Sequence, residues 1–275
     1  MNRCIANPGE SIDCFFHHRG IPLAVYCRLL EYGFTDRLKI MEHSHPGPPF
    51  ARLFVFHRGG AEVELPDAGR HVTLRPGIIY LLPPGLSFDI RYGVSQLIYF
   101  HLHIGDAAGR PVFDTVREIL SLADPILLKQ FRASIFDDAR WAALAAIVWA
   151  LGVWLEPRFD ELARRSEEAR QFARLFEYLR HTPPGRVSVK ELAEVEHLTP
   201  DALSKRFARV FKMPLSHYLA DFRMRRAREL VLHSELSIGE IARELGFADS
   251  QYFQRFFKQH DGVTPGNYRR LRREI

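Results

Sequence analysis

The chain has 275 residues, of which 47% are hydrophobic and 26% are charged. These proportions are typical of a soluble globular protein and argue against a disordered, collagen-like or coiled-coil chain. The length suggests two domains, or one large one.

The net charge of +5 is unevenly distributed. Residues 1–165 carry 18 Lys and Arg against 18 Asp and Glu, whereas residues 166–275 carry 20 against 15. A basic segment attached to a neutral one is expected when one part binds a polyanion and the other has another role. A basic face that is merely solvated is the alternative.

The cysteines are few. Cys4, Cys14 and Cys27 form no C-x-x-C pair and lack the spacing of a zinc site, and this sparse, odd number suits a reducing compartment. The N-terminus has no apolar stretch of signal-peptide length, and the longest apolar run, residues 141–155, is shorter than the roughly 20 residues of a membrane helix. We therefore predict a cytoplasmic protein without membrane contact.

Residues 50–104 indicate β-structure. Short apolar runs are separated there by turn signals such as Arg58-Gly59-Gly60 and Pro83-Pro84-Gly85, with no helical periodicity between them. The pattern predicts an antiparallel sandwich or small barrel. The runs are residues 50–57, 61–65, 71–74, 78–82 and 96–104. In the last run two sets of side chains alternate, so the strand has two faces, either of which could point inward. The two sets are Ile98, Phe100, Leu102, Ile104 and Leu97, Tyr99, His101, His103.

The order His43-Ser44-His45, Arg75-Pro76-Gly77, Pro83-Pro84-Gly85 resembles the cupin layout at the N-terminus of AraC/XylS-type regulators, over residues 41–104. Metal-binding cupins add a Glu and a third His to the His-x-His pair. Here prolines follow His45 and Phe88 stands at a later ligand position. Two of four ligands are missing, and although His101 or His103 could substitute, we predict no metal site.

A ligand pocket in such a barrel needs an apolar wall and a few polar groups. Aromatic residues can supply the wall, and one arginine and two histidines the polar groups; the alternative is that the aromatic rings simply fill the barrel. The candidate effector-binding residues are His43, His45, Arg52, Phe54, Tyr80, Phe88 and Tyr99, with Phe56 as a further wall residue.

Helical patterns follow at residues 112–130 and 137–155, the second starting at Asp137-Asp138, which suits a helix N-terminus. The second helix is apolar all round and must be covered on every side. One side can pack on the barrel, and a second copy of the chain most easily covers the other. We predict a homodimer interface here, with burial inside one chain as the alternative.

Residues 237–260 read as a helix-turn-helix. Ser237 caps the first helix and Glu240 completes a capping box, Gly246 supplies a left-handed turn, and small Ala242 lets the helices cross closely. The second helix, residues 249–260, buries Tyr252 or Phe253 together with Phe256 and Phe257.

About 49 residues earlier a similar unit appears. Ser188 starts its first helix, and Thr199 with Pro200 starts a second helix over residues 200–211, with Leu203, Phe207 and Val210 inward. Between the units, residues 214–233 predict a helix about 30 Å long, close to the ~34 Å between successive major grooves on one face of DNA. Its buried stripe is Tyr218, Leu219, Phe222, Leu230 and Val231.

Residues 187–270 strongly resemble the DNA-binding domain of the AraC/XylS family. The resemblance lies in Gly246-Phe247, Tyr252-Phe253, Arg255, Phe257-Lys258, Gly262-Val263-Thr264-Pro265 and Tyr268-Arg269. It implies that the C-terminal domain binds promoter DNA and that the N-terminal domain senses an effector or dimerises. The implied partners are promoter DNA, a second copy of the chain, RNA polymerase and a small-molecule effector, with no cofactor.

Carried over by motif position, the DNA-binding candidates lie on the second helix of each unit. Asp201, Ser204 and Lys205 in the first, and Ser250, Gln251 and Arg255 in the second, are candidates for reading bases, since Gln pairs with adenine and Arg with guanine. Gln254 also remains outside. Arg209 and Lys258, like Arg223, Arg225, Arg226 and Arg228, are phosphate contacts or a solvated face.

The first unit departs from the family at three positions. His197 and Lys212 stand where glycine is usual, and Glu196 stands where an apolar residue usually packs. His tolerates positive φ more readily than most residues, but at some cost.

These observations predict an α+β protein with several domains. We place a cupin-like effector-binding barrel at 1–110, a helical dimerisation segment at 111–156, a linker at 157–167 and a tandem helix-turn-helix domain at 168–275. The predicted function is that of a sequence-specific DNA-binding transcriptional regulator, dimeric and modulated through its N-terminal domain, and not an enzyme. The alternatives are a metal-dependent cupin enzyme with a DNA-binding tail and a nonspecific architectural protein.

Overall fold

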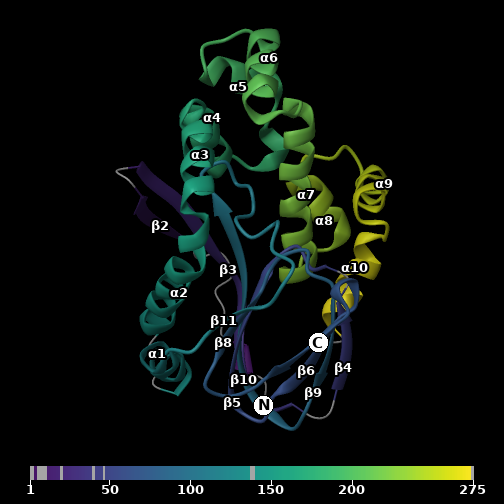
Figure 1. Ribbon diagram of the computed structural model, residues 1–275. Helices are drawn as coiled ribbons and strands as arrows, with labels where there is room; N and C mark the ends of the chain where they lie inside the picture. Colours follow the sequence, from purple (N-terminus) through teal and green to yellow (C-terminus); the bar gives the residue numbers. More distant parts are fainter. Residues whose placement is uncertain are drawn as a thin grey trace. The chain divides into compact units, whose positions relative to one another are not determined.

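The computed structural model describes residues 3–4, 11–18, 21–38, 41–45, 47–136 and 140–273. The chain divides into two compact units (Figure 1). The first comprises Met1–Asp106 and Arg110–Ala163, and the second comprises Ala107–Gly109 and Arg164–Ile275.

The first unit contains two antiparallel sheets, which confirms the predicted α+β class and its β-sandwich. The larger sheet has the order β1 (Arg3–Cys4), β3 (Ile21–Leu38), β10 (Ser95–Asp106), β5 (Ala51–Arg58), β8 (Ile79–Leu82), β11 (Leu120–Leu122), with β2 (Ser11–His18) also paired to β3. The smaller has the order β4 (Met41–His45), β9 (Phe88–Tyr92), β6 (Ala61–Leu65), β7 (Arg70–Leu74), and a single 3-10 turn, η1 (Pro66–Ala68), joins β6 to β7.

Strand β10 buries both of its faces, which the alternation in the sequence left open. Ile98, Phe100 and Leu102 belong to a hydrophobic cluster that also contains residues of helices α1 (Pro125–Phe136) and α2 (Arg140–Leu155). Leu97 points the other way, into a cluster formed by both sheets, which includes Phe56 of β5 and Phe88 of β9. The larger sheet therefore has helices on one face and the smaller sheet on the other.

The predicted helix at 112–130 is wrong in its first half. Val112, Phe113 and Val116 are buried in the cluster beneath α1 and α2 without forming a helix, because covering the sheet decides their conformation. Helix α1 begins only at Pro125, where Asp124 Oδ1 accepts hydrogen bonds from the backbone N–H groups of two first-turn residues, at 2.9 and 3.0 Å. Asp124 followed by Pro125 is a local signal for the start of a helix, and it marks the true beginning of α1.

Helix α2 confirms the predicted apolar helix over Arg140–Leu155, while the proposed start at Asp137-Asp138 lies outside the described residues. Leu151 and Leu155 are fully buried against the larger sheet. On the opposite side Trp149 is 65% exposed and Val153 is 42% exposed. The run Ala142–Arg170 is long and apolar enough to cross a membrane by length and composition alone, but the buried face of α2 is part of a protein core.

The segment predicted as a linker is helical. The 3-10 turn η2 (Glu156–Arg158) leads directly into α3 (Phe159–Arg170), and the division between the two units falls inside α3, after Ala163.

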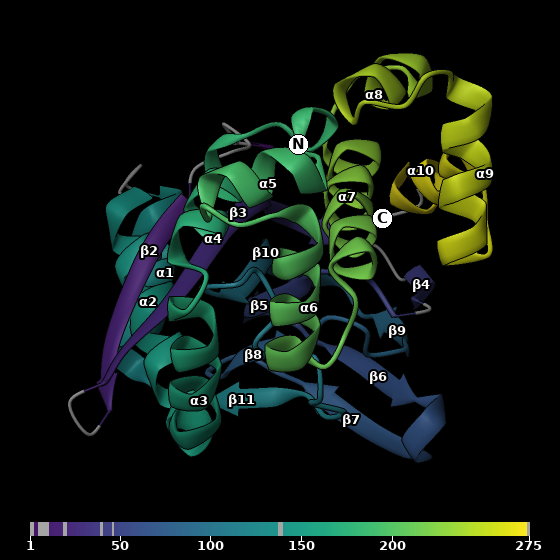
Figure 2. The same ribbon diagram turned by 90° about the horizontal axis from the view of Figure 1, so that it is seen from above.

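The second unit is all-helical and has two hydrophobic cores, both of which include part of the long helix α7 (Leu215–His233). Leu215, Tyr218 and Leu219 pack with α4 (Ala173–His181), α5 (Val189–Val195) and α6 (Pro200–Phe211). Leu230 and Val231 pack with α8 (Ile238–Glu244) and α9 (Ser250–Asp261), and α10 (Pro265–Arg273) follows. Figure 2 shows α5 and α6 on one side of α7 and α9 and α10 on the other.

Candidate nucleic-acid interface

The second unit contains the same two-helix arrangement twice. In each copy a serine N-cap and a glutamate three residues later form a capping box: Ser188 with Glu191 at the start of α5, and Ser237 with Glu240 at the start of α8. Each box satisfies two backbone N–H groups at the helix start. The predicted pair of helix-turn-helix units is therefore present, with α5–α6 and α8–α9 as its members.

The two turns share one hydrogen-bond pattern. After α8, the N–H of Phe247 donates to the carbonyl of Ala242 at 2.9 Å. After α5, the N–H of Leu198 donates to the carbonyl of Ala193 at 2.8 Å. This is the Schellman pattern, which requires a left-handed residue at the turn. Gly246 takes that place in the second helix-turn-helix with φ +76°, and His197 takes it in the first helix-turn-helix with φ 55°.

The left-handed conformations of His197 and Lys212 were anticipated from the sequence and are strained. Lys212 ends α6 with φ 56°, at the place where Gly262 ends α9 with φ 73°.

Replacing either His197 or Lys212 with glycine is expected to raise the free energy of unfolding by roughly 0.5–1 kcal/mol, because relief of the left-handed strain outweighs the extra freedom of glycine in the unfolded chain. Urea titration of each variant measures this change, and a lower unfolding midpoint would contradict it.

Glu196 has a structural role that explains its departure from the usual apolar residue. Its Oε1 accepts a hydrogen bond at 2.8 Å from the backbone N–H of Leu175, in the first turn of α4. The residue at the N-cap of α4, Phe172, provides no side-chain hydrogen bond of its own. A carboxylate is favourable at a helix N-terminus, so Glu196 caps α4 from a distant part of the sequence.

Glu196→Ala is expected to lower the free energy of unfolding by about 1 kcal/mol, because it removes this cap and its charge. Thermal unfolding followed by circular dichroism measures the loss. Glu194→Ala is the matched control, since Glu194 lies exposed on the preceding helix α5. Equal stability of the two variants would refute the capping role.

Helices α6 and α9 present matching faces to solvent. Leu203 and Phe207 are the buried residues of α6, and Phe253 and Phe257 those of α9. Thr199 and Asp249 cap the two helices through side-chain bonds to Ala202 and Tyr252 N–H groups. By helical periodicity the side opposite the buried pair carries Lys205 in α6 and Arg255 in α9.

All nine predicted DNA-binding side chains lie outside the hydrophobic cores. The exposed members are Asp201, Lys205, Arg209, Gln251, Arg255 and Lys258, and the half-buried ones are Ser204, Ser250 and Gln254.

Three of these side chains, Asp201, Ser204 and Lys205, form hydrogen bonds within their own helix. Lys205 Nζ lies 2.9 Å from Asp201 Oδ2, and this hydrogen bond raises the pKa of Lys205. Ser204 Oγ donates to the carbonyl of Pro200 at 2.7 Å. In the first helix-turn-helix, Ser204 and Lys205 must therefore exchange these hydrogen bonds for contacts to bases. In the second helix-turn-helix, Gln251 faces solvent.

Tyr252 was missed as a surface residue, because the sequence left open whether it or Phe253 is buried. Phe253 is fully buried and Tyr252 is 52% exposed. The guanidinium of Arg255 lies 5.9 Å from the centre of the Tyr252 ring. In the repeat, the buried residues Leu203 and Phe207 of α6 correspond to Phe253 and Phe257 of α9. This correspondence in the sequence indicates that Tyr252 lies on the surface.

Three arginines of α7 make contacts within the protein, two of them with other elements. Arg223 Nη2 donates to the carbonyl of Val187 at 2.8 Å, and Arg226 pairs with Glu229 at 2.9 Å. Arg228 Nε donates to Asp261 at the end of α9 at 2.9 Å. These contacts show that the three arginines are not a merely solvated face, while phosphate binding by them stays a prediction.

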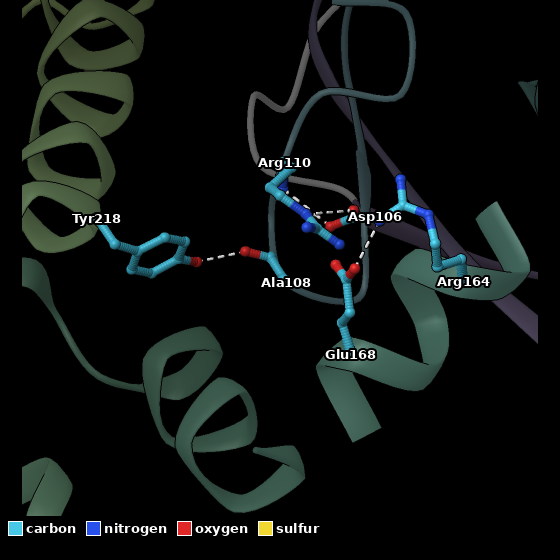
Figure 3. A network of polar contacts seen from close by, with 6 residues as sticks. All are labelled: Asp106, Ala108, Arg110, Arg164, Glu168 and Tyr218. Atoms are coloured by element: carbon cyan, nitrogen blue, oxygen red, sulfur yellow. Dashed lines mark hydrogen bonds and ion pairs between the residues drawn. The ribbon is translucent and has the colours of Figure 1, made fainter. Parts of the chain in front are cut away.

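The second unit also includes the tripeptide Ala107–Gly109, which follows β10 in the sequence. Ala108 is buried in the core of the first helix-turn-helix, and its carbonyl accepts a hydrogen bond from the Tyr218 hydroxyl (Figure 3). On either side of the tripeptide, Arg110 Nε donates to Asp106 Oδ2 at 2.8 Å, which closes the loop.

In the first unit, one group of predicted effector-binding residues lies close together. Arg52 Nη1 donates to His45 Nε2 at 2.8 Å, and the two side chains are buried, with 2% and 7% exposure. The guanidinium also lies 5.5 Å from the centre of the Phe88 ring, and His43 lies 6.1 Å from His45 between ring centres. Burial and the neighbouring charge of Arg52 lower the pKa of His45 to about 2, so that this imidazole stays neutral.

The other predicted effector-binding residues share the cluster between the sheets with Phe88, and they have polar contacts of their own. Phe54 and Tyr80 face each other across β5 and β8 and belong to the cluster between the sheets, and the Tyr80 hydroxyl accepts from Arg75 N–H at 3.0 Å. Tyr99 donates to Glu31 at 3.3 Å.

A divalent cation does not fit at the His43–His45 pair. The Nε2 lone pair of His45 accepts from Arg52, and the guanidinium charge repels a second cation. His101 Nδ1 lies 3.4 Å from Glu31, and the Tyr26 hydroxyl lies 3.3 Å from His103 Nε2, so both substitute histidines have partners of their own.

The comparisons with known proteins centre on the second unit. A family model described as "Helix-turn-helix domain" matches residues 192–271. The activator RhaR of Enterobacter sp. is 27% identical over 173 residues, covering 62% of this chain and 61% of that protein. The uncharacterised HTH-type regulator YijO of Escherichia coli is 24% identical over 240 residues, covering 80% of this chain and 81% of YijO.

Among solved structures, the C-terminal domain of AraT from Geobacillus stearothermophilus has 33% identity and a TM-score of 0.35, covering 37% of this chain and 85% of that one. The chain spans only 17–61% of the length of three of its curated relatives.

Proposed function

This chain belongs to the AraC family of helix-turn-helix transcriptional regulators, and we propose that it reads a specific two-part promoter sequence through α6 and α9. It is a DNA-binding regulator and not an enzyme. The observation that carries the proposal is the pair of matching helices, each capped at its start and each with polar or charged side chains opposite its buried residues.

The length of α7 supports binding to neighbouring grooves. Its 19 residues span about 28 Å at 1.5 Å per residue, near the ~34 Å between successive major grooves. The two readers pack around opposite ends of this helix. One chain thus presents two helices to one face of a duplex.

The side chains divide into two roles. Gln251 and Arg255 read bases in one half of the site, with Ser250 and Gln254 beside them, and Asp201, Ser204 and Lys205 read the other half. Arg209 and Lys258 contact phosphates, which position the protein without reading sequence. Arg255 carries the most specificity, because a guanidinium can donate two hydrogen bonds to guanine.

Selection of bound duplexes from a random DNA pool tests the proposal. We expect a conserved sequence in two blocks about one helical turn apart, and an affinity that falls steeply as salt rises. Random DNA that competes as well as the selected sequence would indicate a nonspecific architectural protein instead.

The exposed apolar face of α2 supports a homodimer. Trp149 and Val153 lie one helical turn apart on a helix whose other side is buried. A large exposed aromatic side chain beside small and apolar neighbours is typical of a protein interface. The dimer would bind promoter DNA in the cytoplasm and act on RNA polymerase, as an activator like RhaR.

The interior of the barrel is the proposed effector site, around His43, His45, Arg52 and Phe88, with Tyr99, Phe54 and Tyr80 as its wall. The connection to DNA binding runs through Ala107–Gly109, because this tripeptide continues β10 and packs in the core of the first reader. A thermal-shift screen of small metabolites identifies effectors by a raised unfolding temperature.

A further inference from the structure

We propose that a backbone contact between Gly185 and Gly246 fixes the separation of the two DNA-reading helices, which makes Gly185 a positioning residue for the two-part site. The proposal rests on the function proposed above. Gly185 lies in η3 (Pro184–Arg186), between α4 and α5, and Gly246 lies in the turn between α8 and α9.

The two glycines approach too closely for any side chain. A Cβ at Gly185 would lie 2.5 Å from the nitrogen and 2.7 Å from the Cα of Gly246. A Cβ at Gly246 would lie 2.3 Å from the Cα of Gly185. These neighbours are backbone atoms, so a rotamer change cannot relieve the clash, and only separation of the two segments can.

On one side the contact is anchored to the first reader. Pro184 and Val187 are buried, and Val187 belongs to the core that holds α5 and α6. Arg223 of α7 donates to the carbonyl of Val187 at 2.8 Å and to that of Pro184 at 3.4 Å. The η3 segment is thereby fixed to both the first core and the long helix.

On the other side the contact is anchored to the second reader. Leu245 is buried in the core that holds α8 and α9, and the hydrogen bond from Phe247 to Ala242 fixes the turn around Gly246. The helix α9 begins at Ser250, a few residues later. The two readers are therefore joined at two places, through α7 and through this glycine pair.

Two attachments restrict the relative position of two bodies more than one helix does. Two linked readers gain affinity only when the geometry lets both engage at once. If the separation of α6 and α9 is fixed, both helices can bind at once only when the two half-sites are a set number of base pairs apart.

The test uses the full chain and Gly185→Ala. The backbone of Gly185 does not have the positive φ that would strain alanine, so the variant introduces a steric clash alone. Gly239→Ala is the matched control, because a Cβ at that position of α8 meets nothing within 4 Å. Arg223→Met is a second variant, which loosens the η3 segment without any clash.

The probes are a duplex selected by the wild-type chain from a random pool, the same duplex with one or two base pairs inserted between its half-sites, and each half-site alone. We expect Gly185→Ala to bind the selected duplex at least about tenfold more weakly, with half-site binding changed less than about twofold. Its preference for the native spacing should weaken, as should that of Arg223→Met, while Gly239→Ala behaves as wild type.

Wild-type spacing preference in both Gly185→Ala and Arg223→Met would overturn the inference. If Gly185→Ala loses half-site binding as well, its fold is damaged, and the spacing preference of Arg223→Met then decides. A wild-type chain that accepts the inserted base pairs as readily as the native spacing also overturns it. Failure of the wild-type chain to select any sequence would instead refute the proposed function.

Discussion

Replacing Gln251 and Arg255 together with alanine is expected to relax discrimination in one half of the DNA site. Both side chains are exposed on α9, and Arg255 lies opposite the buried Phe253 and Phe257. Each bidentate contact to a base contributes roughly 1–3 kcal/mol of discrimination, so the double variant should lose about 30-fold or more in affinity for the selected duplex. Binding to random DNA should change little.

Competition binding at fixed salt measures this effect, with each base pair of the selected duplex substituted in turn. Lys258→Ala is the control for a phosphate contact, for which affinity should fall for all sequences and the salt dependence should decrease by about one counterion. If the double variant still distinguishes every base pair as the wild type does, the assignment of α9 residues to base reading is wrong.

Trp149→Glu is expected to dissociate the proposed homodimer. Trp149 is 65% exposed in the single chain, in the middle of a helix that is otherwise apolar. Tryptophan at the centre of an interface commonly contributes 2 kcal/mol or more, and a buried charge without a partner would add to the loss. The dissociation constant should therefore rise about 30-fold or more, because every 1.4 kcal/mol is a factor of ten.

Sedimentation velocity at micromolar concentration measures the change in mass. Val94→Glu is the matched control, since Val94 is 72% exposed outside the helices and strands of the first unit. The Val94 variant should stay dimeric, and both variants should keep the wild-type secondary structure by circular dichroism. A wild-type chain that sediments as a monomer would contradict the dimer and leave the face of α2 to another partner.

The helix-turn-helix units were predictable because their signals are local. The capping boxes at Ser188 and Ser237, the turn at Gly246 and the apolar periodicity of α6 and α9 act within a few residues of the chain. The strained turn at His197 was predictable in the same way, because the repeat shows which position must be left-handed. The strands within residues 50–104 were predictable from the apolar runs and from the turn residues between them.

The sequence by itself thus determined the two helix-turn-helix units and the long helix between them, their likeness to a known family and the outward position of their polar side chains. Only the tertiary structure decided that Val112, Phe113 and Val116 pack against a sheet without forming a helix, that Glu196 caps α4 and that Arg223, Arg226 and Arg228 make contacts within the protein. The close approach of Gly185 to Gly246 also emerged only there. Each of these depends on which distant segments meet, and burial against such a neighbour outweighs the weak preferences that short-range patterns express.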